Sequence, residues 1–544
     1  MTTGGVLRQS PKHEGLVRDF GGAPPLGRPV MGPVTTALRI FMAGLMAALA
    51  GCAGLPASVE RQPSSAYTDT ADTRLGLALA AAVAAHPGRT GVLPLLSGRE
   101  AFAARMIIAR AAERSIDVQY YIWHGDTTGN LLFEALWQAA ERGVRVRLLL
   151  DDQNTRGLDP TLAALDAHPN VEVRLFNPFA NRRFRAVDFA ISFSRVNRRM
   201  HNKSFTVDNQ VAIVGGRNIG DEYFEAGAEV AFSDLDTVVE GAVVRDVSAQ
   251  FDAYWNSTSA YPLATLLPAA DAAGVAAVRD ALSRLGASPA AAEYLDAVRE
   301  TTLVQQLVAG KLEVEWVPAR LVSDDPDKVL HPPERRDLQM GPRLEAAMGR
   351  PTTEMDLVSP YFVPTQDGTD ALLAVAARGV KVRVLTNSLA ATDVAPVYAG
   401  YVKYRDALLR GGVRVFELKR QVAERPKGKL GDSSGASLHA KTFGVDRARI
   451  FIGSFNLDPR SARLNTEVGV VLDSASLATQ LSDAFDRNIP RLAYEVRLTG
   501  DGQGVEWIEA TPSGEVRHSS TPGAGPGRML YINLLRILPI EWLL

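Results

Sequence analysis

The sequence predicts an α/β fold made of two related halves, each an α/β/α sandwich, placed about a pseudo-two-fold axis with the active site between them. The order strand, helix, strand occurs in both halves: strands at 116–122 and 142–150 flank one helix, and strands at 355–361 and 378–385 flank another. This alternation is typical of a sheet covered by helices on both faces. We therefore expect a largely parallel sheet in each half.

A short motif that occurs twice supports the same duplication. Each copy has the pattern His-x-Lys-x4-Asp and is followed, at the same distance, by two small residues and an asparagine. The first copy is His201, Lys203 and Asp208 with Gly215, Gly216 and Asn218; the second is His439, Lys441 and Asp446 with Gly453, Ser454 and Asn456. Two copies with matched partners indicate a duplicated domain rather than chance.

Local periodicity places both motifs on hairpins. Residues 200–207 alternate as a strand does, so His201 and Lys203 share one face. A turn is expected at 208–210 and a returning strand at 211–214. The second copy repeats this pattern, with a strand at 438–445, a turn at 446–449 and a strand at 450–452.

The doubling of the histidine has a chemical meaning. One histidine cannot attack a phosphorus and at the same moment protonate the group that leaves on the opposite side. Two histidines on either side of one phosphate can, because imidazole titrates near neutrality and one ring can start neutral while the other is protonated. Lysine and asparagine side chains would supply the positive charge and hydrogen bonds that the transition state needs. No Asp/His/Glu group has metal-ligand spacing, so we expect neither a metal nor a cofactor.

These motifs resemble those of the phospholipase D superfamily, the phosphodiesterases with duplicated H-x-K-x4-D motifs. The resemblance implies the phospholipase D fold, a phosphohistidine intermediate on His201 and proton donation by His439. The implied catalytic residues are His201, Lys203, Asp208, His439, Lys441 and Asp446. Within this set we expect Asp208 and Asp446 to have a structural role, because they lie at the hairpin turns.

The remaining site residues follow from the same resemblance. Asn218, Ser454 and Asn456 are expected to bind phosphate. Each histidine also needs a carboxylate on its other ring nitrogen, and in relatives this acid comes further along the chain. Glu467 fits that place for His439, and Asp236 is the corresponding expectation for His201.

Longer segments resemble bacterial cardiolipin synthases of the C type, and the match extends over nearly all of the chain after the amino-terminal segment. The segments that carry this resemblance are 117–123, 199–205, 214–221, 387–393, 458–465 and 537–544. It implies transfer of a phosphatidyl group from one phospholipid to the glycerol hydroxyl of phosphatidylglycerol. A hydrolytic phospholipase D, with water as acceptor, is the alternative. A nuclease and a non-catalytic membrane scaffold are less favoured.

The amino-acid composition indicates which class of molecule the protein acts on. The 544 residues are 46% hydrophobic and 22% charged, with a net charge of −2 and no long basic stretch. These values are typical of a globular protein and do not favour a nucleic-acid substrate. Membrane phospholipids are the expected partners. Because both motifs lie in one chain, a monomer can hold a complete site.

The amino-terminal segment predicts a bacterial lipoprotein. An apolar run at 40–50 has the length of a signal-peptide core and ends at Leu49-Ala50-Gly51-Cys52, which resembles a lipobox. Cys52 is the only cysteine and would be the lipidated first residue; a plain secretory signal is the alternative. The long segment before Met31 suggests that Met31 is the true start. Because Ala53 is not the aspartate that retains lipoproteins at the inner membrane, we expect a periplasm-facing protein of the outer membrane.

The expected organisation along the chain has six parts. They are a signal peptide with lipobox (1–52), a tether (53–75), a first phospholipase D-like repeat (76–263), a helical linker (264–309), a second repeat (310–490) and a carboxyl-terminal extension (491–544). Residues 321–342 are expected to form a loop whose charges lie on the solvated surface; a lid over the cleft is the alternative. The apolar tail at 529–544 is too short to span a bilayer and is expected either to dock on the protein's own surface or to enter the lipid interface.

Overall fold

The computed structural model describes residues 54–56, 59–226, 231–420 and 436–544. The chain divides into two units, Met1–Gly54 and Leu55–Leu544. The predicted signal peptide, the start at Met31, Cys52 and Ala53 all lie outside the described residues. Both sheets and the candidate site lie in the second unit.

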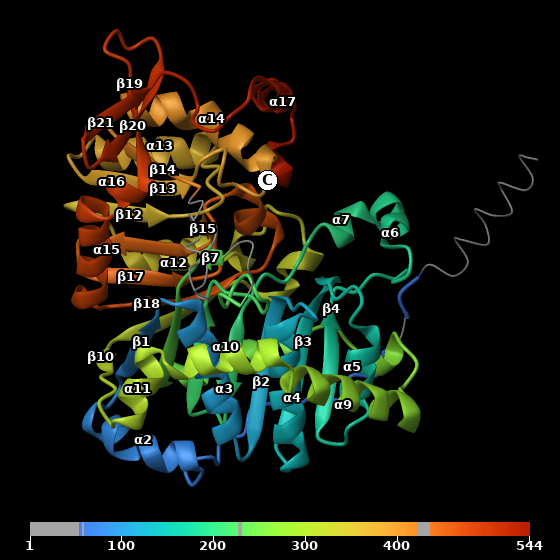
Figure 1. Cartoon of the computed structure of the whole chain (residues 1–544). Coiled ribbons are helices and arrows are strands. Elements are labelled where there is room, and N and C mark those ends of the chain that lie inside the picture. The colour runs from blue at the N-terminus through green and yellow to red at the C-terminus, as the bar shows by residue number, and fades with distance from the viewer. Residues whose placement is uncertain (1–53, 57–58, 227–230, 421–435) are drawn as a thin grey trace, which may run out of the picture. The chain divides into compact units, whose positions relative to one another are not determined.

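The first half is built on a nine-stranded sheet (Figure 1). In spatial order its strands are β10 (Glu315–Val317), β1 (Thr90–Leu95), β8 (Asp236–Gly241), β6 (Val211–Gly215), β5 (Ser204–Val207), β2 (Ser115–Ile122), β3 (Arg145–Asn154), β4 (Val171–Phe176) and β9 (Ala260–Pro262). Only β2, β3 and β4 run parallel to one another. The expectation of a largely parallel sheet is therefore wrong, because the motif hairpin and the edge strands pair antiparallel.

The second half repeats this arrangement in a ten-stranded sheet. In spatial order its strands are β11 (Ala319–Ser323), β18 (Val468–Leu472), β17 (Arg449–Gly453), β16 (Lys441–Val445), β12 (Glu354–Val358), β13 (Lys381–Asn387), β14 (Arg414–Leu418), β19 (Ala493–Leu498), β20 (Val505–Thr511) and β21 (Gly514–His518). Again only the three consecutive strands β12, β13 and β14 are parallel. Because β10 belongs to the first sheet and β11 to the second, the chain passes between the halves at about residue 318 rather than at 310.

Helices cover both faces of each sheet, as the fold class predicts. In β3, Leu148 and Leu150 pack with helices α3 (Gly98–Ala111), α4 (Thr127–Glu141) and α5 (Asp159–Asp166), whereas Leu149 packs with α8 (Val244–Trp255). Successive side chains of a strand point to opposite faces, so this division defines a sandwich. In the second half α12 (Met340–Met348), α13 (Thr365–Ala376) and α14 (Ala395–Arg410) cover one face, and α15 (Ala475–Arg487) and α16 (Ile489–Leu492) cover the other.

A buried ion-pair group recurs in both halves and marks the duplication. Arg147 pairs with Asp117 at 2.7 Å and with Asp252 at 2.7 Å. In the second half, Arg383 pairs with Asp356 at 2.6 Å and with Asp486 at 2.5 Å. Each arginine comes from the second parallel strand, and its partners come from the first parallel strand and from the helix on the other face.

An apolar cluster joins the two halves beneath the motif hairpins. It contains Ala212 and Val214 of β6, Ile450 and Ile452 of β17, and Val470 of β18. These residues are almost fully buried, so the halves share one continuous core. The hairpin that carries each motif is therefore packed against its counterpart rather than against solvent.

The predicted helical linker contains three helices, α9 (Ala272–Gly286), α10 (Pro289–Arg299) and α11 (Thr302–Val308). Leu282, Tyr294 and Leu303 from these helices enter the core of the first half. The segment thus adds a layer to the first half before the chain crosses to the second.

The segment predicted to be a tether is packed on the first half. Arg61 donates to the carbonyl oxygens of Ala260 and Thr258, and the amide of Ala66 donates to Asp252. Arg174 and Arg147 donate to carbonyl oxygens of this segment. A free tether of about twenty residues is therefore wrong, because these contacts hold the chain from about residue 61 up to α2 (Arg74–Ala85).

The carboxyl-terminal extension completes the second sheet and then folds back onto the surface. After β21, helix α17 (Pro526–Ile537) packs on α14 through Ile532 and Leu535. The main-chain carbonyl of Leu543 accepts from Arg460 at 2.7 Å. The tail therefore docks on the protein's own surface, with one apolar face left outside. Within the part of the chain that the structure describes, no helix is long and apolar enough to cross a membrane.

Candidate active site

The two motif hairpins position the histidines and lysines at the junction of the halves. His201 and Lys203 directly precede β5, and His439 and Lys441 stand at the start of β16. Both imidazoles are buried to the same degree, 7% exposed, and both ammonium groups are almost inaccessible. Each lysine donates back to the carbonyl of its own motif histidine. This local bond ties the lysine and the histidine of each motif into one rigid unit.

The motif aspartates anchor the hairpin turns and do not face the histidines. Asp208 accepts hydrogen bonds from the amides of residues 113–115, and Asp446 accepts from the amides and hydroxyls of residues 352–354. Both aspartates have positive φ, 50° and 55°, as the tight two-residue hairpin turn requires. Burial opposes ionisation of Asp446, but these donors outweigh it and lower its pKa to about 2. This geometry is the one expected of a structural role for both residues.

Each histidine is oriented by a carboxylate from the other half. Nδ1 of His201 lies 2.8 Å from Oε2 of Glu467, and Nδ1 of His439 lies 2.5 Å from Oδ2 of Asp234. Both carboxylates are fully or almost fully buried. The site is therefore two crossed His–carboxylate pairs, each made from both halves of the chain. Such a bond fixes the ring and leaves Nε2 as the nitrogen available for a reacting atom.

Main-chain hydrogen bonds produce this crossing. The amide of His201 donates to the carbonyl of Thr466, and the amide of His439 donates to the carbonyl of Ser233. Each accepting residue directly precedes the acid that orients that histidine. In addition, β7 (Ala231–Ser233) and β15 (Ala436–Leu438) pair in parallel between the halves. These main-chain hydrogen bonds therefore place each acid beside the histidine of the other half.

Two sequence-based expectations for the acids are wrong. Glu467 orients His201 rather than His439, and Asp236 orients neither histidine. Asp236 is buried in an ion pair with Arg105 at 2.8 Å and lies 3.7 Å from Arg217. The register explains the error, because Asp236 pairs with Gly215 where Gly469 pairs with Gly453. The residue equivalent to Glu467 is therefore Asp234, two positions earlier.

The two acids differ in what surrounds them. Oε2 of Glu467 accepts from the hydroxyl of Ser454 at 2.5 Å, and Oε1 accepts from Ser461 at 2.7 Å. At the position equivalent to Ser454 the first half has Gly216, where a Cβ would lie 2.1 Å from Oδ1 of Asp234. Asp234 therefore requires glycine at position 216, whereas Glu467 leaves room for the side chain of Ser454.

These different surroundings give the two acids, Glu467 and Asp234, different pKa values. Burial raises the pKa of Glu467 to about 7, although Lys203 and the two serine hydroxyls oppose this. Burial also acts on Asp234, but His439 and Lys441 outweigh it and hold the pKa of Asp234 below its ordinary value. Burial and nearby cations lower the pKa of both histidines, that of His201 well below its ordinary value. Of the two rings, His201 is therefore the one held more strongly in its neutral form.

The two lysines are less strongly protonated than free ammonium groups, so the positive charge that they bring to the site is smaller. Burial lowers the pKa of Lys203 to about 7 and that of Lys441 to about 8. Both lysines contribute to the lowered pKa of His201, as does His439. The four motif groups therefore lie close enough to act on one another, as binding of a single phosphate between them requires.

The residues expected to bind phosphate do not behave alike. Asn218 is held from both ends, since its amide donates to Tyr223 at 3.1 Å and its oxygen accepts from the amide of Ile122. The hydroxyl of Ser454 is committed to Glu467. The side-chain oxygen of Asn456 is buried and has no hydrogen-bond partner among the described residues. Because an amide oxygen only accepts hydrogen bonds, this free oxygen is no phosphate contact, and Asn456 could bind a phosphate only through its amide nitrogen.

A supporting layer behind Glu467 was not foreseen from the sequence. Oδ2 of Asp324 accepts from the amide of Glu467 at 2.8 Å, and Lys328 donates to Asp324 and to the carbonyl of Ser461. Both side chains are buried. The prediction of a solvated loop at 321–342 is therefore wrong for this part, because β11 and these two charges lie beneath the site. Only their position behind Glu467 in the folded chain reveals their role.

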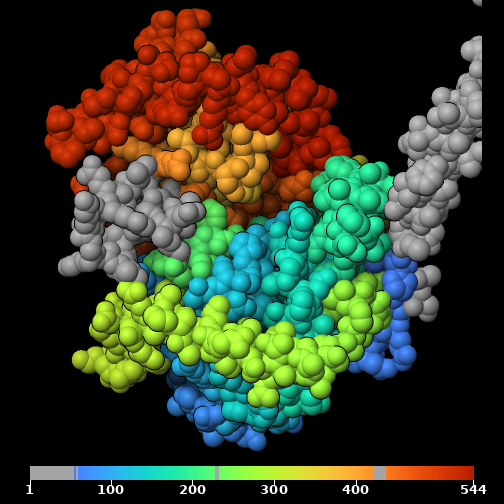
Figure 2. All heavy atoms as spheres, turned by 45° about the vertical axis from the view of Figure 1, so that its right-hand side comes forward, coloured from blue at the N-terminus to red at the C-terminus, as the bar shows by residue number. Residues whose placement is uncertain are grey.

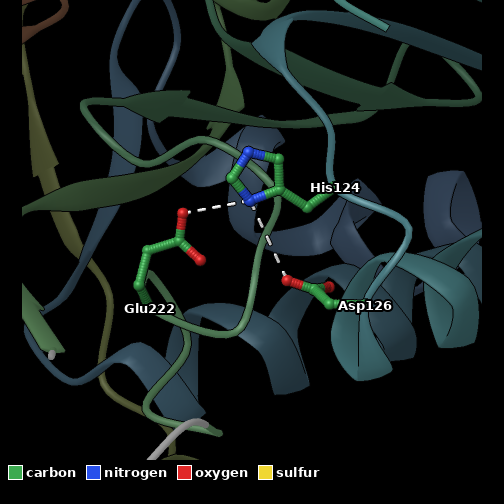
Figure 3. Close-up of side chains that lie close together, drawn as sticks. All are labelled: His124, Asp126 and Glu222. Atoms are coloured by element: carbon green, nitrogen blue, oxygen red, sulfur yellow. Dashed lines mark ion pairs between the residues drawn. The ribbon is translucent and has the colours of Figure 1, made fainter. Parts of the chain in front are cut away.

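Aromatic and ionic side chains lie beside the histidines. Tyr121 contacts His201 edge to face with ring centres 4.9 Å apart, and Tyr223 contacts His439 in the same way. Three residues beyond Tyr121, His124 lies 3.1 Å from Glu222 and 4.0 Å from Asp126 (Figure 3). A hydrogen bond from Glu222 raises the pKa of His124, which favours the protonated ring. The three side chains have metal-ligand spacing that the sequence does not show, because Glu222 is far from His124 in the chain.

Comparison with known proteins agrees with this geometry. Residues 106–255 and 344–489, one segment in each half, match the family described as "Cardiolipin synthase, PLD-like domain". The chain is 46% identical to cardiolipin synthase C of Escherichia coli over 87% of this chain and all of that protein. It is 25% identical to the major cardiolipin synthase ClsA of Bacillus subtilis over 77% of this chain and 73% of that protein.

A solved structure shares the fold. The crystal structure of phosphatidylserine synthase of Haemophilus influenzae aligns with a TM-score of 0.54 at 13% identity, over 83% of this chain and 95% of that one. The duplicated phospholipase D architecture that the sequence predicts is therefore confirmed.

Proposed function

This chain belongs to the family of cardiolipin synthases with phospholipase D-like domains, and on that premise we propose that it transfers a phosphatidyl group to the glycerol hydroxyl of phosphatidylglycerol, making cardiolipin. The observation that carries the proposal is the pair of crossed His–carboxylate contacts, His201 with Glu467 and His439 with Asp234. They present two imidazoles from opposite halves to one phosphate. A phosphodiester exchange needs both a nucleophile and an acid.

In the first step Nε2 of His201 attacks the phosphorus of the donor phospholipid. The bond from phosphorus to the headgroup oxygen breaks, and His439 gives that oxygen a proton. The product is a phosphatidyl group bound to His201 and a free headgroup alcohol. Charge that builds on the phosphoryl oxygens is stabilised by Lys203 and Lys441.

In the second step the reaction runs in the opposite sense with a new alcohol. The glycerol hydroxyl of phosphatidylglycerol loses its proton to His439 while its oxygen attacks phosphorus. The bond between phosphorus and His201 breaks, and both histidines return to their starting state. The acid of the first step is thus the base of the second.

The environments of the two histidines support this division of roles. His201 is the more strongly depressed imidazole, and a nucleophile must be neutral. Burial and Lys441 lower the pKa of His439 as well, but less strongly, because the adjacent Asp234 opposes them and favours the protonated ring that a proton donor needs. This difference supports His201 as the nucleophile and His439 as the acid.

The acceptor decides between transfer and hydrolysis. The enzyme should be incubated with labelled phosphatidylglycerol, with and without phosphatidylethanolamine, and the products separated by chromatography. Labelled cardiolipin with release of glycerol or ethanolamine is the expected result. Phosphatidic acid as the main product, with no cardiolipin at any lipid concentration, would establish a hydrolase instead.

We also propose that the protein is anchored at a bacterial membrane as a lipoprotein, through Cys52. The support is the lipobox at 49–52, since no described helix can span a membrane. Because the chain is packed on the first half from about residue 61, the free linker is far shorter than twenty residues, and the enzyme would be held close to the lipid headgroups. Cys52→Ser should abolish incorporation of labelled fatty acid, as followed by metabolic labelling and membrane fractionation. Equal labelling of the variant would exclude this anchor.

A further inference from the structure

An exposed apolar face lies beside the active site and is formed by two segments far apart in the chain. One is the helix pair α6 (Arg185–Ile191) and α7 (Phe193–Val196), and the other is α17 with the residues that follow it. The large apolar side chains exposed on the two segments are Phe184, Phe189, Ile191, Phe193, Leu530, Tyr531, Leu534, Ile537, Leu538 and Trp542. We call this set the apolar face.

The two segments are in contact, so they form one surface. The ring of Phe193 meets that of Trp542 edge to face at 6.3 Å. Arg460 joins them further, since it donates to the main chain and side chain of Asn197 and to the carbonyl of Leu543. Figure 2 shows the green segment of α6 and α7 beside the red carboxyl-terminal segment on the same side of the molecule.

Helix α17 is amphipathic, and its outer side has no partner among the described residues. Ile532 and Leu535 are buried against the protein, whereas Leu530 is 73% exposed and Ile537 is 77% exposed. Exposed apolar side chains that gather in one patch mark an interaction site, in contrast to single exposed ones. Docking of the tail on the protein therefore explains the apolar residues on the inner side of α17, but not those on its outer side.

Three arginines on or next to the two segments, Arg183, Arg528 and Arg536, make no ion pair among the described residues. The acids on the two segments are neutralised or hidden: Asp188 is buried, and Glu541 is paired with Lys403 at 3.4 Å. This contrasts with the net charge of −2 for the whole chain. The surface thus combines apolar and aromatic side chains with unpaired arginines.

From these observations we propose that the apolar face formed by α6, α7 and the segment from α17 to Trp542 inserts into the headgroup region of an anionic phospholipid bilayer. Apolar and aromatic side chains bordered by arginine are what such an interface takes up. Unpaired arginines favour anionic lipid over zwitterionic lipid and over a second copy of this acidic chain. The identity of the lipid as phosphatidylglycerol rests on the proposed function.

The position of the apolar face gives the insertion a role. Phe193 lies on the segment that leads through Asn197 to the motif histidine His201, and Arg460 follows closely after Asn456. The face therefore borders the elements that carry both motifs. Insertion would hold the site at the membrane surface, where a phospholipid can enter without leaving the bilayer fully.

Quenching of Trp542 by lipid tests the insertion directly. The full-length protein is bound to phosphatidylglycerol vesicles with brominated acyl chains, and its fluorescence is compared with that of Trp542→Phe. The other tryptophans are buried, or stacked on His86 in the case of Trp316. Bromolipid should quench the wild-type signal and leave the variant nearly unchanged. Equal fractional quenching of the two proteins would overturn the proposal, even if a lipid anchor keeps both on the vesicles.

A second experiment separates docking from chemistry. The pair Leu534→Asp with Ile537→Asp should lower turnover on phosphatidylglycerol vesicles about tenfold and leave turnover in detergent micelles within about twofold of wild type. The matched control, Leu77→Asp with Val308→Asp, changes exposed apolar residues on α2 and α11 and should affect neither. Equal vesicle activity of the two double variants would refute the docking role.

Two further results would contradict either the proposed function or the bilayer proposal. If the wild-type enzyme makes no cardiolipin in micelles, the proposed function fails, while the quenching experiment still decides the docking. If sedimentation velocity shows a dimer that the pair Leu534→Asp with Ile537→Asp converts to a monomer, the face is covered by a second copy of the chain and the bilayer proposal is overturned.

Discussion

The two halves of the molecule carry the same hairpin but offer different acids to each other. The first half contributes Asp234, which lies over Gly216. The second contributes Glu467, which accepts from the hydroxyls of Ser454 and Ser461. The backbone arrangement is equivalent, since each acid follows a carbonyl that accepts from the histidine amide of the other half.

This difference shows how the two equivalent histidines of a duplicated site can take different roles. The symmetric backbone brings two histidines to one phosphate, and two identical histidines would compete for the same role. Unequal acids separate their proton affinities, because Glu467 has its pKa raised to about 7 whereas Asp234 remains ionised. In the proposed mechanism, duplication thus sets the geometry, and divergence between the halves sets which ring attacks and which donates.

The largest expected effect comes from removing either histidine. His201→Ala and His439→Ala should each reduce turnover by about 10⁴-fold or more, because nucleophile and acid act as one unit. The double variant should be little worse than either single one. Steady-state assays of cardiolipin formation in micelles measure this, and near-normal activity of one single variant would remove that histidine from the mechanism.

A substrate with a good leaving group tells the two histidines apart. A nitrophenyl ester of phosphatidic acid needs no proton on its leaving oxygen. His439→Ala should therefore still release nitrophenol in a burst and hold a phosphatidyl group on His201, detectable by mass spectrometry after acid-free quenching. His201→Ala should give no burst. A modification found on His439 instead would reverse the assignment.

The crossed acids should have the next largest effect. Glu467→Gln and Asp234→Asn should each lower turnover about 10²- to 10⁴-fold while the fold persists, because each removes the charge that orients one ring. With the nitrophenyl substrate, the burst should survive in Asp234→Asn and be lost in Glu467→Gln. Asp236→Asn is the control: it leaves Arg105 without its buried partner, so it should lower the melting temperature with little change in the turnover of folded enzyme.

The turn aspartates should affect stability rather than chemistry. Asp446→Asn keeps a residue that tolerates positive φ but replaces one acceptor oxygen by a donor, which should cost about 2 kcal/mol of unfolding free energy. Asp208→Asn should act in the same way in the first half. Denaturant titration measures the loss, and turnover per folded molecule should stay near that of wild type. A loss of turnover without a loss of stability would place these residues in the reaction.

The smallest expected effect is a shift in pH dependence. Burial raises the pKa of Glu467 to about 7, and the nucleophile requires the ionised form, so kcat/KM should fall as the pH drops through about 7. Glu467→Gln has no group to protonate there, so its residual activity should lose this acidic limb. Asp234→Asn should retain it. A limb that persists in Glu467→Gln would have to be assigned to another group that must be deprotonated, such as the imidazole of His201.

Local features of the site were determined by the sequence alone. The alternation at 200–207 and the turn at Asp208 depend on neighbouring residues, and so does the second copy at 438–446. For that reason the hairpins, the position of both motif aspartates at their turns and the duplicated sandwich could all be predicted. The resemblance carried by the motifs supplied the family.

Only the tertiary structure decided which groups from distant segments meet. The pairing of β7 with β15 carries Asp234 to His439, and the carbonyl of Thr466 carries Glu467 to His201. Neither contact can be seen in the local periodicity of the sequence, because each forms between the two halves. The burial of Asp324 and Lys328 behind Glu467, and the packing of the presumed tether on the first half, have the same origin. Contacts set by sequence neighbours can be predicted from the chain, whereas contacts set by the docking of two folded halves require the structure.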